Sequence, residues 1–136
     1  MAKNRGFSLI ELIVVLVVLG LLAGVVGIKV TRWGVEGKIR TTKLQISQFK
    51  PALETFRLDV GRYPTSSEGL SALVENAGIE GWGGPYLDDN LPKDAWKRPY
   101  NYRFPGEHRE YDIWSYGGDG AQGGEGENAD ITSWGE

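Results

Sequence analysis

Carboxylates gather near the C-terminus, in the segment SYGGDGAQGGEGENADIT. The acidic and amide side chains of this segment are Asp119, Glu125, Glu127, Asn128 and Asp130. Hard cations such as Ca²⁺ take six to eight oxygen ligands from carboxylates, amides and backbone carbonyls. The many glycines let a chain fold closely around an ion. The composition therefore suits a calcium site, with a solvated acidic loop as the simpler alternative.

Other catalytic chemistry has little support in the sequence. His108 is the only histidine and there are no cysteines, so nucleophilic triads and histidine-based zinc sites cannot be assembled from one chain. We expect His108 on the surface of a turn. Gly118, Gly120 and Gly123 fit G-x-G-x-x-G, but no βαβ unit surrounds them and the nearby carboxylates would repel phosphate. A net charge of −3 without a basic cluster argues against a nucleic-acid partner. We predict that the protein is not an enzyme.

A lone glutamate, Glu11, lies in the apolar run RGFSLIELIVVLVVLG. From Phe7 to Ile28 the run would form a helix of about 33 Å, which matches a bilayer core of about 30 Å. Thirteen of the seventeen residues from Leu12 to Ile28 are Leu, Ile or Val. They supply about −4 to −8 kcal/mol of insertion energy, against about 2.5 to 3.5 kcal/mol for a charge at the helix centre. The sequence predicts a transmembrane helix over 7–28.

The flanking charges predict the orientation of this helix. Lys3 and Arg5 precede it, so the positive-inside rule leaves residues 1–6 in the cytoplasm and residues 29–136 on the other side of the membrane. A cleaved secretory signal fits poorly, because Glu11 interrupts the apolar region and no A-x-A site follows. A simple anchor explains the length and the flanks but leaves Glu11 unexplained.

A basic leader that ends in Gly6 and is followed by Phe7, Ser8 and Glu11 resembles the class III signal of type IV pilin-like proteins. The resemblance implies that a membrane prepilin peptidase cuts between Gly6 and Phe7 and methylates the new Phe7 amine, while the helix stays in the mature chain. It also implies that Glu11 meets the amine of a neighbouring subunit. Opposite charges attract strongly at a low-dielectric packing site, so this contact favours assembly in a fixed register.

The remaining pattern predicts an α+β fold. Apolar residues recur on one helix face at Ile46, Phe49, Leu53, Phe56 and Val60. This helix should kink or restart with Pro51 in a first-turn position and end near Gly61.

A short second helix should follow a cap at Thr65 or Ser66. An ordered loop should then be pinned by aromatic rings, namely Trp82, Tyr86 and Trp96. PYNYRF and EYDIWSY alternate as a hairpin does, and DITSW adds a third short strand. The expected architecture is a long N-terminal helix, with a transmembrane half and an amphipathic half, packed on a small antiparallel sheet in a pilin-like fold.

Three segments, DVGRYPTSSEGLSALV, GPYLDDNLPKDAWKRPY and YDIWSYGGDG, resemble the major pseudopilins of bacterial type II secretion systems. The resemblance implies a leader at 1–6, a filament-core helix at 7–28 and a periplasmic domain at 29–136. It implies a subunit of a helical homopolymer, the periplasmic pseudopilus, which helps to push folded proteins through an outer-membrane secretin. The partners it implies are the prepilin peptidase, minor pseudopilins and an inner-membrane assembly platform.

The same resemblance places a calcium ion in the loop 115–131. It assigns Asp119, Asp130 and the carbonyl of Tyr116 as ligands. Between these positions the chain departs from the family pattern, and we expect the remaining oxygens from Asn128, Glu127 or Glu125, in that order. The alternatives are a type IV pilus subunit used for adhesion or motility and a membrane-tethered calcium-binding domain.

Overall fold

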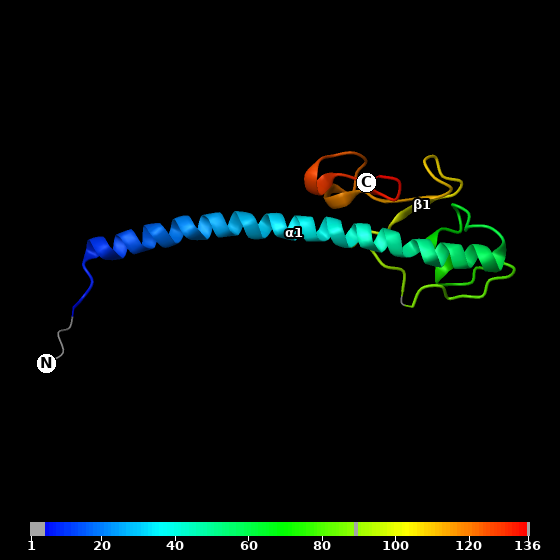
Figure 1. The fold of residues 1–136 in the computed structure, drawn as a ribbon, viewed down its shortest axis with the longest axis horizontal. Helices are drawn as coiled ribbons and strands as arrows, with labels where there is room; N and C mark the ends of the chain where they lie inside the picture. The colour runs from blue at the N-terminus through cyan, green and yellow to red at the C-terminus, as the bar shows by residue number, and fades with distance from the viewer. Residues whose placement is uncertain (1–4, 89, 136) are drawn as a thin grey trace. The chain divides into compact units, whose positions relative to one another are not determined.

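The computed structural model describes residues 5–88 and 90–135, without the side chains of 27–31. Most of the predicted leader, residues 1–4, lies outside this range. The chain divides into two units, Met1–Val35 and Glu36–Glu136, and helix α1 (Leu9–Val60) contributes to both. Figure 1 shows the second unit as the last part of α1 with the sheet and loops beside it.

In the first unit, α1 has the length and composition of a membrane span. The segment Leu9–Val26 has a mean hydropathy of 3.0, and none of it is buried inside the structure. Leu9 is 73% exposed and Leu21 is 68% exposed. These apolar side chains have no cover within the described chain, so something other than this subunit must shield them from water.

In the second unit, the apolar stripe of α1 forms the centre of the core. Phe49, Leu53 and Phe56 are at most 1% exposed, whereas Val60 is half-buried at the edge. The helix ends at Val60 as predicted, because Gly61 adopts a φ of +91° and its N–H donates to the carbonyl of Arg57 at 2.8 Å. A glycine in this left-handed conformation closes a helix without Cβ strain.

Of the kink or restart predicted at Pro51, the restart and the first-turn position are wrong, because α1 is a single helix through that position. A proline inside a helix costs about 3 kcal/mol. Pro51 is exposed, but Phe49 and Leu53, two residues before and after it, are buried. Burying two such side chains gains about 1.5 to 3 kcal/mol each, which is enough to keep the helix on the core.

A three-stranded antiparallel sheet covers this face of α1. The strands are β1 (Asn101–Arg103), β2 (Asp112–Ser115) and β3 (Ile131–Thr132), in the order β1-β2-β3. Tyr102 pairs with Ile113, and Ser115 pairs with Ile131. Ile113 and Ile131 are buried in the same core cluster as the helix stripe. The predicted hairpin and third strand are confirmed.

The predicted second helix is shorter and later than expected. Thr65 caps a turn instead: its hydroxyl accepts from the Glu68 N–H at 3.1 Å, and the Glu68 carboxylate accepts from the Thr65 N–H at 2.8 Å. Gly69 then adopts a φ of +67°, which interrupts a regular helix. A 3₁₀ helix, η1 (Leu70–Leu73), follows the break.

The loop after η1 is held by aromatic side chains, as predicted. The indole of Trp82 donates to the carbonyl of Ala72 at 2.6 Å. Tyr86 meets Phe56 edge to face, with ring centroids 5.5 Å apart, and its hydroxyl donates to Asp59 at 2.9 Å. These contacts bring residues far from α1 in sequence against its last turns.

Asp112 organises the connection between β1 and β2. Its side chain is fully buried, yet its carboxylate accepts from the Arg103 guanidinium at 3.0 Å and from the Glu107 N–H at 2.8 Å. His108 lies 3.1 Å from the same carboxylate, and its ring stacks on Trp134 with centroids 4.0 Å apart. His108 is therefore in a surface turn, as expected, with one face of its ring stacked on Trp134.

Burial alone would raise the pKa of Asp112. The hydrogen bonds from Arg103, His108 and backbone amides outweigh burial, and they hold this pKa well below its usual range. A carboxyl whose pKa is lowered by folding stabilises the folded state at any pH above its pKa in the unfolded chain, which is about 3.9 for Asp. The stabilisation is lost as the pH falls from there through the lower folded pKa.

We predict that Asp112→Asn lowers the free energy of unfolding by about 1.5 to 3 kcal/mol at pH 7, because a neutral amide loses the charge-assisted hydrogen bond from Arg103 and turns an N–H group toward backbone donors. Denaturant unfolding of the full chain in detergent measures this difference. The gap between wild type and variant should be constant from pH 7 to 5 and shrink below pH 4. Asp88→Asn, at an exposed position, is the control. Equal effects of the two variants would contradict the role of Asp112.

Candidate functional site

The predicted cleavage position lies immediately before α1. Gly6 and Phe7 are exposed and outside the helix, and the Phe7 side chain is 86% exposed. A Cβ atom added to Gly6 would meet nothing within 4 Å. The fold therefore does not require glycine at position 6.

Glu11 takes part in a reciprocal cap at the start of α1. The Ser8 hydroxyl accepts from the Glu11 N–H at 3.2 Å, and the Glu11 carboxylate accepts from the Ser8 N–H at 3.3 Å. This is a capping box, which satisfies two backbone donors at a helix N-terminus. Sequence reasoning missed this role of Ser8, although the S-x-x-E spacing carries the signal.

The acidic loop closes through a pair of glycines. Gly117 has a φ of +71°, and a Cβ there would lie 2.6 Å from the carbonyl oxygen of Ala129. At Gly118 a Cβ would lie 2.9 Å from Glu127 Cγ and 3.0 Å from the Asn128 amide oxygen. The two 3₁₀ helices, η2 (Gly117–Asp119) and η3 (Gly126–Asn128), therefore come this close only because Gly117 and Gly118 have no side chains.

The two ligands that the resemblance assigns most firmly lie in different environments. Asp119 is exposed, and one of its oxygens accepts from the Ala121 N–H at 3.1 Å. Asp130 is half-buried, and its Oδ2 accepts from the Gly123 N–H at 3.0 Å. Its Oδ1 is buried with no hydrogen-bond partner among the described residues. Leaving such an oxygen unsatisfied costs about 1 to 3 kcal/mol, and more for a charged group.

The other predicted ligands differ in their surroundings. Glu127 accepts a hydrogen bond from the Trp96 indole at 3.1 Å, while Glu125 and Asn128 are exposed. Tyr116 immediately precedes η2. In the part of the chain that the structure describes, no three Asp, Glu, His or Cys side chains form a ligand group. A cation here would need Asn128 and backbone carbonyls as well as carboxylates.

By donor chemistry, the loop fits a hard cation. All the predicted side-chain ligands of the loop coordinate through oxygen, as Ca²⁺ prefers. The Asp130 Oδ1, which has no hydrogen-bond partner among the described residues, is an oxygen that an ion would satisfy. The backbone conformation draws the 117–118 segment against the 127–129 segment. The structure thus brings together the two ends of the predicted site, although not all of its side chains.

Arg98 anchors the loop, a role that the sequence did not reveal. Its guanidinium donates to the carbonyl of Gly117 at 2.8 Å and to that of Gly118 at 3.2 Å. A Cβ at Gly120 would lie 2.7 Å from Arg98 Cζ, so the loop passes close over this cation. Arg98 lies 19 residues before Gly117, and no motif joins them.

A buried hydrogen-bond network fixes the root of the loop to α1. Asp94 is 5% exposed; its carboxylate accepts from the Arg98 N–H at 2.9 Å and from the Ser115 hydroxyl at 2.7 Å. The Ser115 hydroxyl in turn accepts from the Gly117 N–H at 3.1 Å. The Ala95 N–H donates to the Thr42 hydroxyl of α1 at 3.3 Å. The loop therefore starts beside Thr42.

Two family models match this chain, one after the other. Residues 1–27 match the prokaryotic N-terminal methylation motif, and residues 29–134 match type II secretion system protein G. The second match covers the domain after the membrane span, which is the part that separates type II secretion from the alternative of a type IV pilus subunit.

Individual relatives give the same result. The type II secretion system core protein G of Pseudomonas aeruginosa is 38% identical over 97% of this chain and 96% of its own length. That of Vibrio cholerae is 37% identical over 98% and 94%. The crystal structure of the major pseudopilin from enterohaemorrhagic Escherichia coli superposes with a TM-score of 0.62 at 30% identity, over 73% of this chain and 84% of that one. A long apolar helix, a small antiparallel sheet and these matches together show that the chain belongs to the type II secretion system protein G family, the major pseudopilins, which are structural subunits of the pseudopilus.

Proposed function

We propose that this subunit is cleaved after Gly6, spans the inner membrane through residues 7–28 and polymerises into a periplasmic filament. The single observation that carries the proposal is the uncovered apolar surface of α1, in which no part of Leu9–Val26 is buried. Lipid can cover it before assembly, and the same segment of other copies can cover it afterwards. The N-terminus stays in the cytoplasm and residues 29–136 lie in the periplasm, in line with the positive charges that precede the span.

Glu11 guides docking in this proposal. Its carboxylate lies near the start of an apolar helix, where a charge is costly unless it is paired. Removing the leader creates an amine on Phe7, four residues before Glu11. When a subunit enters the filament, the amine of one copy and the Glu11 carboxylate of another meet in a low-dielectric site, where opposite charges attract strongly. The capping contact with Ser8 holds the carboxylate at the helix end before docking.

The proposed partners follow from the family. They are a prepilin peptidase, minor pseudopilins, an inner-membrane assembly platform and an outer-membrane secretin. Growth of the polymer pushes folded proteins toward the secretin, and a cytoplasmic ATPase supplies the energy through the platform. The loop 115–131 belongs to the periplasmic domain and takes no part in supplying that energy.

We also propose that the loop 115–131 binds Ca²⁺. Asp130 offers its unpartnered Oδ1, and Asp119, Asn128 and the carbonyl of Tyr116 supply further oxygens. Glu127 joins them if its carboxylate leaves Trp96. When bound, the ion supplies positive charge that links the start of the loop to its end. The chain has no cysteines to make such a link by a disulfide.

Processing should depend on the residue at position 6. With a co-expressed prepilin peptidase, intact-mass spectrometry should show a chain that begins at Phe7 and carries one added methyl group. Gly6→Val should remain uncleaved, because the fold tolerates a side chain there and only recognition is lost. Gly20→Ala, where a Cβ also meets nothing within 4 Å, should be processed normally. An intact N-terminus of the unmodified chain, or cleavage near Ala23, would refute the proposal.

Glu11→Gln separates the charge of Glu11 from its capping role. Glutamine can still form a capping box but cannot pair with an amine as an ion. We expect the variant to enter the membrane fraction at wild-type levels and to form no filaments by electron microscopy. Glu36→Gln, at another exposed position on α1, should assemble normally. If Glu11→Gln assembles and only Glu11→Ala fails, the contribution of Glu11 is helix capping.

Calcium should stabilise the folded chain. At a concentration 100 times the Kd, ligand binding adds about 2.7 kcal/mol to the free energy of unfolding, which is measurable in thermal melts of the full chain in detergent with Ca²⁺ or with a chelator. Asp130→Asn should abolish the response, and Glu75→Gln, an exposed position outside the loop, should keep it. A wild-type melt that neither addition changes would show that the loop binds no calcium.

A further inference from the structure

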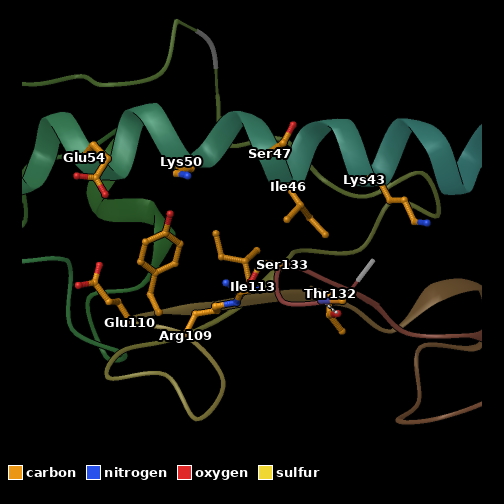
Figure 2. A pocket seen from close by; sticks show the side chains of 12 residues that line it. Lys43, Ile46, Ser47, Lys50, Glu54, Arg109, Glu110, Ile113, Thr132 and Ser133 are labelled. Atoms are coloured by element: carbon orange, nitrogen blue, oxygen red, sulfur yellow. Dashed lines mark hydrogen bonds between the residues drawn. The ribbon is translucent and has the colours of Figure 1, made fainter.

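A groove runs between α1 and the sheet side of the second unit (Figure 2). Its volume is about 590 Å³. Ile46 and Ile113, both buried, form an apolar floor, and the hydroxyls of Thr132 and Ser133 line one end. An apolar floor with a polar rim is the usual form of a site that binds a chain segment.

Three cations stand on the rim of this groove. Lys43 and Lys50 come from α1 and Arg109 comes from the connection between β1 and β2, and all three are exposed (Figure 2). Within the described residues, none of the three side chains lies within 4.0 Å of a carboxylate oxygen. The lining therefore holds three cations against two carboxylates, Glu54 and Glu110, and the positive charges are in excess.

The two carboxylates that line the groove are already engaged. The Tyr63 hydroxyl lies 2.5 Å from a Glu54 oxygen and 3.1 Å from a Glu110 oxygen. The Arg57 guanidinium also donates to Glu54 at 3.2 Å. These contacts hold both acids at one end of the groove, so the other end, toward Lys43, is the electropositive one.

The chain itself contains a segment of matching charge. Residues 119–130 carry four carboxylates and no Lys, Arg or His. Of these carboxylates, Glu125 is exposed, and the described contacts give its side chain neither an ion pair nor a hydrogen bond. Its neighbours are occupied: Glu127 accepts from Trp96 and Asp130 accepts from Gly123. Among the exposed acids of the loop, Asp119 bonds the Ala121 N–H through one oxygen, so Glu125 is the one whose side chain has no described contact.

The loop adjoins only one end of the groove. Its root is linked to Thr42 through Ala95 and Asp94, next to the lining residue Lys43, whereas Lys50 is eight residues further along α1, about 12 Å at 1.5 Å per residue. Figure 1 shows the loop, in orange and red, on the N-terminal side of β1 along the helix. A second copy displaced along α1 can therefore bring its loop to the groove of the first.

We propose that the acidic loop of one subunit docks through Glu125 into the groove of another copy, against Lys43, Lys50 and Arg109. This inference rests on the proposed polymerisation and adds a contact between the periplasmic domains. Exposed charge pairs contribute mainly to specificity and orientation, so the contact sets the stagger between copies, whereas the apolar helices supply most of the affinity.

Cysteine cross-linking tests the contact cleanly, because the chain has no cysteines of its own. Copies with Lys50→Cys and copies with Glu125→Cys are co-expressed with a prepilin peptidase, and the assembled filaments are oxidised. We expect a disulfide dimer that contains one copy of each variant, identified by mass spectrometry. The matched control replaces Lys50→Cys with Leu58→Cys, which is 79% exposed on the same helix and outside the groove; it should give at least a tenfold weaker dimer.

Charge exchange provides a second readout. Lys50→Glu and Glu125→Lys should each reduce the yield of filaments several-fold, and the two changes in one chain should restore it. Filaments that form without the Lys50 to Glu125 cross-link, or with equal cross-linking at Leu58, would overturn the contact and leave polymerisation standing. Cross-linking of the groove to a different protein would likewise overturn it. If the cysteine-free wild type forms no filaments, the proposed polymerisation is wrong, and the docking contact that rests on it is wrong as well.

Discussion

The burial of one face of α1 is the interaction on which the rest of the domain depends. Phe49, Leu53 and Phe56 are almost completely excluded from water, and the sheet and the aromatic loop pack around them. Strands of three, four and two residues are too short to be stable alone. The helix is therefore the platform on which so small a sheet can exist. The same helix leaves Leu9–Val26 uncovered. Its own domain stabilises one end of the helix, and in the proposed function lipid or other copies cover the other.

Buried acids supply the cross-links that cysteines would supply in another small domain. Asp112 joins the β1–β2 connection to Arg103 and His108, and Asp94 joins the end of β2 to the segment before β1. Each carboxylate satisfies several donors at once, which makes its burial favourable. Such networks specify a single arrangement of loops, because every partner must be in place for the charge to be tolerated.

The sequence predicted those parts of the fold that follow from local pattern. The stripe from Ile46 to Phe56, the end of α1 before Gly61 and the three strands follow from periodicity and turn residues, and they are confirmed. The restart predicted at Pro51 was wrong because the low helix propensity of proline was considered without the burial of Phe49 and Leu53. The short helix after Thr65 was misplaced because Gly69 interrupts it.

The candidate sites show the same division between local and distant contacts. The S-x-x-E spacing of Ser8 and Glu11 is a local pattern, and it was readable as a cap. Arg98 could not be foreseen, because its contacts with Gly117 and Gly118 join residues that only the folded sheet brings together. For the same reason, the composition of the acidic loop predicted oxygen ligands but not that Glu127 would be turned toward Trp96.

Charge balance links the two roles proposed for the acidic loop. Its four carboxylates carry −4, and Arg98, which holds its backbone, contributes +1. A bound Ca²⁺ would add +2, which leaves a net charge of −1 on the closed loop. An ion held by Asp119 and Asp130 would neutralise those two acids and leave Glu125 and Glu127, of which Glu127 is bound to Trp96. Calcium binding would therefore order the segment that carries Glu125 and reduce the repulsion within it. The ion and the neighbouring subunit would use different carboxylates of the same loop, so the loop can serve both.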